Sequence, residues 1–257
     1  MEEKLWKIGR KLGFSSGELK DIQWLAVGPF QRVELCKTSS TLELKQSLKR
    51  KIERRWVEHL QKHPHDFPGP LASVCEIKME GAILTLTLKR TDYKTYIATR
   101  WKKRKRLVKQ RPLDREFPLP LSIGAVTVTE DNKIIVGIRE RVGLARGLAD
   151  TLPSGYFNPE EDARWEDCLV RELREEIGIE KFTKLKILGL IFDCKITQQP
   201  LLAVNLQLPF TSSEINWIGE ETLEMIFIDN DINSIKERGY SWTPHARGKL
   251  ILYFALS

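Results

Sequence analysis

The chain has 257 residues, which exceeds a single minimal domain of roughly 100–200 residues, so we expect one full domain and a smaller companion. Apolar residues make up 41% of the chain and charged residues 30%, which allows a hydrophobic core and argues against disorder. The net charge of +7 suits anionic partners such as phosphates or nucleic acid without identifying one.

Cysteine spacing and hydropathy argue against two further classes of protein. The cysteines stand far apart, without a Cys-x-x-Cys pair or a nearby pair of histidines, so we expect buried, reduced thiols instead of a disulfide framework or a zinc site. No run of about 18 apolar residues occurs, which argues against a membrane-spanning helix. We therefore expect a cytoplasmic protein that has no membrane partner.

An amphipathic helix is predicted after residue 40. Ser40-Thr41-Leu42-Glu43 has the form of a capping box, the side-chain arrangement that starts many helices. Pro64 is expected to end the helix. One face is apolar because hydrophobic residues recur every four positions, at Leu44, Leu48, Ile52, Trp56 and Leu60.

A hairpin and a basic segment follow this helix. The β-rich runs 71–78 and 82–89 flank a short turn at 79–81, which predicts a hairpin packed on the helix. A short helix or irregular linker is expected over 91–101. Eight of the twelve residues from Arg100 to Arg111 are Lys or Arg, and prolines follow them. We therefore place a domain boundary there, with an α+β extension over 1–118 and a second domain over 119–257.

The second domain is predicted to mix strands and helices. Two strands, 122–130 and 134–139, are expected on either side of an Asp131-Asn132 turn. A loop leads to Leu152-Pro153-Ser154-Gly155 and then to a helix that ends near Gly178. The prediction is completed by strands near 185–192, 201–208 and 223–228, and by a last helix that starts at Thr243-Pro244.

Three glutamates share one face of the helix that ends near Gly178. Glu172, Glu175 and Glu176 stand at i, i+3 and i+4, and their like charges repel unless something neutralises them. Carboxylate oxygens are preferred ligands of Mg²⁺ and Mn²⁺. Arg171, one residue before the cluster, can tether the preceding loop or pair with Glu175. The alternative is an exposed helix with i, i+4 ion pairs.

The segment 171–179 reads RELREEIGI and resembles the second half of the Nudix box at every specified position. The first half of that motif is a Gly, five residues, a Glu, and seven residues before the Arg. Gly155 and Glu161 have the first spacing, but nine residues separate Glu161 from Arg171, and counting back from Arg171 gives Ala163. Either the loop has two extra residues or this glutamate is absent.

Strings outside the box resemble the UDP-sugar pyrophosphatase subgroup of Nudix hydrolases, which also has an amino-terminal extension. They are Asp150–Gly155, Thr91-Asp92-Tyr93, the helix ending in Trp56, and Pro244–Gly248 followed by Leu250–Tyr253. The resemblance implies an α/β fold, a Nudix α/β/α sandwich with a mixed sheet, preceded by a smaller α+β domain. It also implies a Mg²⁺- or Mn²⁺-dependent hydrolase of a nucleoside diphosphate derivative, foremost a UDP-sugar, which yields UMP and a sugar 1-phosphate.

The same resemblance assigns roles to individual residues. The three glutamates would hold metal ions that activate water for in-line attack, with Arg171 beside them. A general base is expected from Glu220 or Glu221, and Glu221 is the narrower choice. Substrate contacts are expected from Arg139, Arg141 and Gly155, and from Tyr93 by stacking on a base, with Tyr96 and Phe157 as further aromatic candidates.

The sequence leaves other functions open. The same chemistry could act on ADP-ribose, a dinucleotide or a capped RNA end. The basic run from Arg100 to Arg111 slightly favours RNA, although such a run is also typical of a solvent-exposed segment without a partner. A regulatory module that only binds a nucleotide is a different class, but all three helix glutamates are present, which favours an enzyme. A homodimer is expected by analogy with the family.

Overall fold

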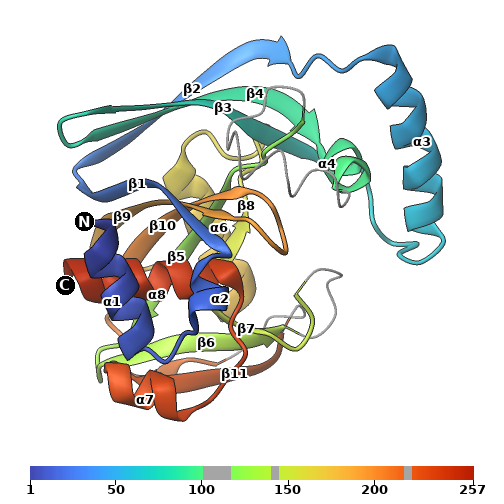
Figure 1. Cartoon of the computed structure of the whole chain (residues 1–257). Helices are drawn as coiled ribbons and strands as arrows, with labels where there is room; N and C mark the ends of the chain where they lie inside the picture. The colour runs from blue at the N-terminus through green and yellow to red at the C-terminus, as the bar shows by residue number, and fades with distance from the viewer. Residues whose placement is uncertain (101–116, 140–144, 217–221) are drawn as a thin grey trace.

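The computed structural model describes residues 1–100, 117–139, 145–216 and 222–257 (Figure 1). The helices are α1 Glu2–Lys11, α2 Ser16–Leu19, α3 Gln46–Leu60, α4 Tyr93–Thr99, α6 Trp165–Ile177, α7 Ile232–Glu237, α8 Pro244–Leu256 and the 3-10 turn η1 Ser212–Glu214. The strands are β1 Ile22–Phe30, β2 Arg32–Thr41, β3 Pro70–Glu80, β4 Ile83–Asp92, β5 Ser122–Val128, β6 Lys133–Arg139, β7 Ala149–Thr151, β8 Ser154–Tyr156, β9 Lys184–Asp193, β10 Pro200–Gln207 and β11 Thr222–Asp229.

Two β-sheets organise the described part of the chain. The larger sheet has the strand order β1-β9-β10-β5-β6-β11, with β7 beside β6 and β8 beside β5. It is mixed, because β10 and β5 pair in parallel while β9 and β10 pair antiparallel. The smaller sheet has the order β2-β4-β3 and belongs to the amino-terminal part.

The larger sheet lies between two layers, which confirms the predicted three-layer arrangement (Figure 1). On one face, Leu250 and Ile251 of α8 share a core with Val126 of β5 and with α1 and α7. On the other face, Leu173 of α6 shares a core with Ile123 of β5, and side chains of the smaller sheet join this core. Burial of these apolar side chains is the main stabilising contribution to such layers.

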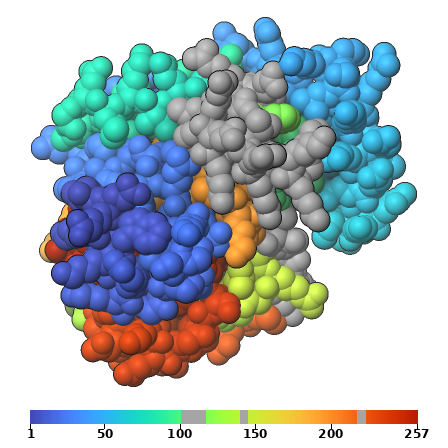
Figure 2. Space-filling model, in the orientation of Figure 1, coloured from blue at the N-terminus to red at the C-terminus, as the bar shows by residue number. Residues whose placement is uncertain are grey.

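The first thirty residues pack against the second half of the chain. β1 pairs antiparallel with β9 at the edge of the larger sheet. α1 contacts α8, and Figure 2 shows the amino-terminal residues in dark blue lying against carboxy-terminal residues in red. The smaller sheet is also attached, because Val74 N donates to Leu119 O and Leu121 N donates to Ala72 O. The domain boundary near residue 118 stays a prediction.

The predicted helix after residue 40 starts later than its capping box suggests. Ser40 and Thr41 belong to β2, and Thr41 pairs with Arg90 of β4, so the sheet engages the backbone that would have started the helix. α3 begins at Gln46, and its N-cap residue makes no side-chain cap. Ile52 and Trp56 are buried as expected.

Other elements confirm the sequence-based expectations. β3 and β4 form the hairpin, and α4 is the short helix. Gly178 caps α6 with a φ of 78°, the left-handed conformation that glycine adopts without strain. α8 begins after Thr243, whose hydroxyl accepts from Ala246 N. Within the described residues no helix is long and apolar enough to cross a bilayer.

The four cysteines are all reduced, as predicted, but they are not all buried. Cys168 and Cys194 are buried, whereas Cys36 is exposed. The expectation of burial was wrong for Cys36 because β2 has a largely exposed second half, in which its side chain faces solvent.

Candidate active site

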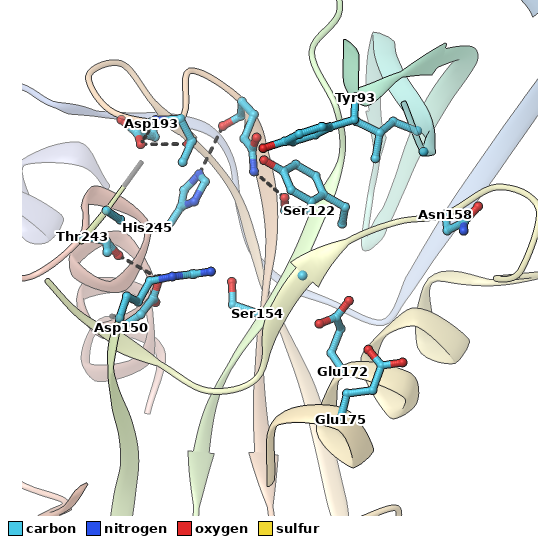
Figure 3. Close-up of a pocket in the computed structure, with 18 of the residues that line it drawn as sticks. Tyr93, Ser122, Asp150, Ser154, Asn158, Glu172, Glu175, Asp193, Thr243 and His245 are labelled. Carbon is cyan, nitrogen blue, oxygen red and sulfur yellow. Dashed lines mark hydrogen bonds and ion pairs between the residues drawn. The ribbon is translucent and has the colours of Figure 1, made fainter. Parts of the chain in front are cut away.

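A cavity of about 510 Å³ brings together elements from both halves of the chain. The loop that precedes β3 and the start of α4 line it on one side, and β8 and α6 line it on another. The β9–β10 turn and the start of α8 complete the wall. Figure 3 shows Ser122, His245 and Tyr93 towards one end of this cavity and Glu172 and Glu175 towards the other.

Two of the predicted metal ligands line the cavity, and Gly155 allows one of them to lie close to β8. The side chain of Glu172 is 13% exposed and that of Glu175 is 53% exposed. A Cβ atom on residue 155 would lie 1.9 Å from Cδ of Glu172, so only glycine leaves room for this carboxylate. The structure therefore gives Gly155 a steric role beside the acidic helix.

Arg171 contacts every residue of the acidic wall, by which we mean the cavity-lining residues Glu161, Glu172 and Glu175. Its Nη1 donates to Glu172 at 2.6 Å and to Glu175 at 3.3 Å, and its Nη2 donates to the Tyr156 carbonyl at 2.9 Å. Burial opposes the charged guanidinium, but hydrogen bonds and charges from Asp162 and Glu172 outweigh it and raise the pKa of Arg171. Arg171 thus both tethers the preceding loop and pairs with Glu175, as predicted.

Asp162 is a partner of Arg171 that the sequence did not reveal. Its carboxylate accepts from Nε and Nη2 of Arg171, each at 3.2 Å, and from Asn158 N at 2.8 Å. Glu161, which has the motif spacing from Gly155, is 65% exposed and approaches Arg171 only to 4.0 Å. The motif position counted back from Arg171 is Ala163, and Asp162 is the residue directly before it. Asp162, with a side chain shorter than that of glutamate, therefore makes the main contact between this loop and Arg171.

Glu176 differs from the other two helix glutamates. It is buried, and its Oε2 accepts a hydrogen bond from Ser154 N at 2.9 Å. Across the described ranges, no three His, Cys, Asp or Glu side chains are already gathered as a metal-binding group. Glu172 and Glu175 face the cavity, while Glu176 is held against the backbone of β8.

A buried charged cluster lies next to Thr243, at the start of α8 (Figure 3). Lys249 of α8 is fully buried, pairs with Asp150 at 3.0 Å and donates to Thr151 O at 2.7 Å. Arg139, the last residue of β6, approaches Asp150 to 3.6 Å. Burial alone would raise the pKa of Asp150, but Lys249 and Arg139 outweigh it and lower that pKa. Arg139 and Asp150 both line the cavity.

His245 lies at the end of the cavity opposite to Glu172 and Glu175 (Figure 3). Its Nε2 lies 3.2 Å from the Gln199 carbonyl, which can only accept, so Nε2 carries the hydrogen. Burial lowers the pKa of His245, against the opposing effect of Asp193 and Asp150. The neutral ring therefore presents Nδ1 as an acceptor.

The aromatic candidates separate into one cavity residue and two that are buried. Tyr93 lines the cavity and packs against the ring of Tyr156 at 6.2 Å. Tyr96 is fully buried and donates from its hydroxyl to Thr197 O at 2.5 Å. Phe157 is also fully buried, under Lys37 of β2, so stacking of a ligand on its ring was a wrong expectation. It was wrong because the side chain points into the core between the sheets.

Several predicted site residues lie outside the described residues. These are Arg141, Glu220, Glu221 and the basic run from residue 101 onwards.

One segment of the chain matches a described protein family. Residues 118–224 match the protein family described as "NUDIX domain". This segment of the chain is therefore similar to a NUDIX domain. No curated protein matches the sequence.

Several solved structures are similar to part of the chain. The NUDIX domain of Shewanella oneidensis NrtR, in a complex with ADP ribose, has 13% identity and a TM-score of 0.43, covering 53% of this chain and 88% of that one. A bifunctional NMN adenylyltransferase/ADP ribose pyrophosphatase from Francisella tularensis has 18% identity and a TM-score of 0.41, covering 60% and 46%. The MutT protein from Methanosarcina mazei Go1 has 17% identity and a TM-score of 0.37, covering 52% and 91%.

Proposed function

We propose that the chain is a Mg²⁺- or Mn²⁺-dependent hydrolase that cleaves the diphosphate bond of a nucleoside diphosphate linked to a second moiety. The observation that carries the proposal is the placement of a single guanidinium, Arg171, among four carboxylates, three of which line the cavity. One positive charge does not balance four negative ones. The wall therefore favours a cation, and a cation there would attract an anionic substrate.

The donor chemistry fits a hard divalent ion. Glu172, Glu175 and Glu176 are the residues that would hold it, because they offer carboxylate oxygens from one helix, which are ligands that Mg²⁺ and Mn²⁺ favour. When bound, such an ion would neutralise diphosphate oxygens and lower the pKa of a water molecule. Glu172 and Glu175 reach the cavity directly, and Glu176 lies behind them against Ser154.

The protein's own residues position the reacting groups. Arg171 is fixed by Asp162 and by the Tyr156 carbonyl, so it holds Glu172 and Glu175 in a defined place. Arg139 lines the cavity with its guanidinium partly exposed, which suits contact with a phosphate oxygen. Glu221 stays our proposed general base.

The second moiety is most simply a sugar, so that a UDP-sugar would yield UMP and a sugar 1-phosphate. The strings shared with the UDP-sugar pyrophosphatase subgroup support this choice, and three of them reach the cavity: Asp150–Gly155, Thr91-Asp92-Tyr93 through Tyr93, and Pro244–Gly248 through its first two residues. A cavity of about 510 Å³ falls in the size range of small-molecule sites, which is about 300–1,000 Å³. A cytoplasmic location and a homodimer also stay proposals.

A substrate panel tests the proposal. The purified chain is incubated with Mg²⁺ or Mn²⁺ and with UDP-glucose, ADP-ribose, an NAD-type dinucleotide or a capped RNA, and the products are separated. We expect UMP and glucose 1-phosphate from UDP-glucose at the highest kcat/KM. Faster turnover of ADP-ribose would support the proposed hydrolysis but would show that the preferred substrate is not a UDP-sugar. Binding without turnover of any compound would favour a regulatory module.

A further inference from the structure

The turn between β9 and β10 carries a side chain with incomplete hydrogen bonding. Gln199 is 4% exposed and lines the cavity. Its Nε2 donates to Ser122 Oγ at 2.5 Å, whereas its Oε1 has no hydrogen-bond partner in the described part of the chain. A buried acceptor without a donor is unfavourable, and a ligand that supplied an N–H group would relieve that cost.

Ser122 supplies the complementary group. Its hydroxyl oxygen accepts from Gln199, so its own hydrogen is available to donate to a second acceptor. Ser122 is the first residue of β5 and also lines the cavity. The two side chains together offer one acceptor and one donor in adjacent positions.

Hydrogen bonds with several residues fix the conformation of the turn that carries Gln199. Asp193 accepts from the backbone amides of Lys195, Ile196 and Thr197 and from the Thr197 hydroxyl. The Tyr96 hydroxyl donates to the Thr197 carbonyl, which links the turn to α4. A recognition group on a fixed turn loses little conformational freedom when it binds, so it discriminates well between ligands.

We propose that Ser122 and Gln199 read the hydrogen-bonding edge of the substrate's nucleobase, an inference that rests on the proposed function. A nucleobase presents an acceptor beside an N–H donor on one planar edge, which complements this pair. The rings of Tyr93 and Tyr156 line the same cavity, and flat aromatic walls suit a planar heterocycle. Ser122 lies at the opposite end of the site from Glu172 and Glu175, so the diphosphate would extend towards the carboxylates (Figure 3).

Nucleotide binding tests the pair without requiring turnover. Titration calorimetry in the presence of Mg²⁺ compares UMP with N3-methyl-UMP, AMP with N6,N6-dimethyl-AMP, and both parents with ribose 5-phosphate. The variant Gln199→Met removes both amide groups at similar volume. Gln198→Met is the matched control, because Gln198 is equally buried and also has an Oε1 without a partner, but it is not among the described residues that line the cavity.

We expect wild type to bind UMP or AMP about tenfold more tightly than its methylated analogue, the scale of one lost hydrogen bond. Gln199→Met should lose this preference, Ser122→Ala should weaken it, and Gln198→Met should keep it, with ribose 5-phosphate unaffected by all three. Equal binding of parent and analogue by wild type, or a loss confined to ribose 5-phosphate, would overturn the inference. Normal hydrolysis with either of those results would leave the proposed function standing, whereas base discrimination without hydrolysis would reject only the proposed function.

Discussion

The Asp162 carboxylate accepts two hydrogen bonds from Arg171, one from Nε and one from Nη2, each at 3.2 Å. Asp162 is itself almost completely buried. This pair joins the loop after β8 to the helix that carries the three glutamates. The backbone carbonyl of Asp162 also accepts from Lys37 Nζ at 2.7 Å, so a residue of β2 holds the same loop. The acidic wall is therefore fixed from the helix, from the loop and from the smaller sheet.

Removing the Asp162 carboxylate should cost far more than removing that of Glu161. For Asp162→Ala we expect a loss of about 3 kcal/mol in the free energy of unfolding, because Arg171 would lose a buried partner. For Glu161→Ala, at an exposed position 4.0 Å from Arg171, we expect a change below about 1 kcal/mol. Urea unfolding of both variants measures the difference. Equal effects would show that Asp162 does not make the main contact with Arg171.

A methyl group at residue 155 should displace Glu172. Gly155→Ala would place Cβ 1.9 Å from Cδ of that carboxylate, so the side chain has to leave its position. We expect the kcat for diphosphate hydrolysis to fall by at least about tenfold, since small displacements of positioned groups are costly. Gly17→Ala is the control, because a Cβ there meets nothing closer than 3.8 Å. Unchanged turnover in Gly155→Ala would argue against a role for the Glu172 position.

Lys249 and Asp150 should behave as a coupled pair. Lys249→Met leaves the Asp150 carboxylate buried with a weaker set of positive neighbours, and a loss of about 3–5 kcal/mol is expected. Adding Asp150→Asn to that variant should restore part of the stability, because the unpaired charge is removed. A double-mutant cycle by thermal or urea unfolding gives the coupling. Strict additivity of the two substitutions would contradict a direct ion pair.

His245 should make stability depend on pH in a defined direction. Burial lowers the pKa of His245 in the folded state, so between that pKa and the unfolded value of about 6.5 the unfolded chain binds more protons. Its contribution to stability is therefore present above about pH 6.5 and is lost as the pH falls. His245→Gln should flatten the decline in the free energy of unfolding between pH 7 and pH 5. An identical pH profile for wild type and variant would assign the decline to other groups.

Regular elements with strong local signals could be predicted from the sequence. The end of α6 at Gly178, the β3–β4 hairpin and the start of α8 after Thr243 each rest on a turn or cap formed by neighbouring residues. The capping box at Ser40 failed because β2 pairs with β4, and a sheet partner fifty residues away leaves no local mark.

The candidate site was predictable only in part. Spacing on one helix placed Glu172 and Glu175 on a common face, which needs no knowledge of the fold. Spacing could not show that Glu176 turns to Ser154 N, nor that Asp162 contacts Arg171 more closely than Glu161 does. It also gave no sign of Gln199 or Lys249, because their neighbours come from distant strands and helices.

The central claim is that carboxylates of α6 serve metal-dependent hydrolysis of a diphosphate bond. The most direct test is the kcat for UDP-glucose, or for the best substrate of the panel, at saturating Mg²⁺ in Glu175→Gln and Glu166→Gln. Both residues lie on α6, but only Glu175 lines the cavity among the described residues. The account predicts a fall of at least about a hundredfold for Glu175→Gln, the scale of losing one group that stabilises developing charge, and near wild-type turnover for Glu166→Gln. Full activity in Glu175→Gln, or turnover that persists after removal of divalent ions, would contradict it.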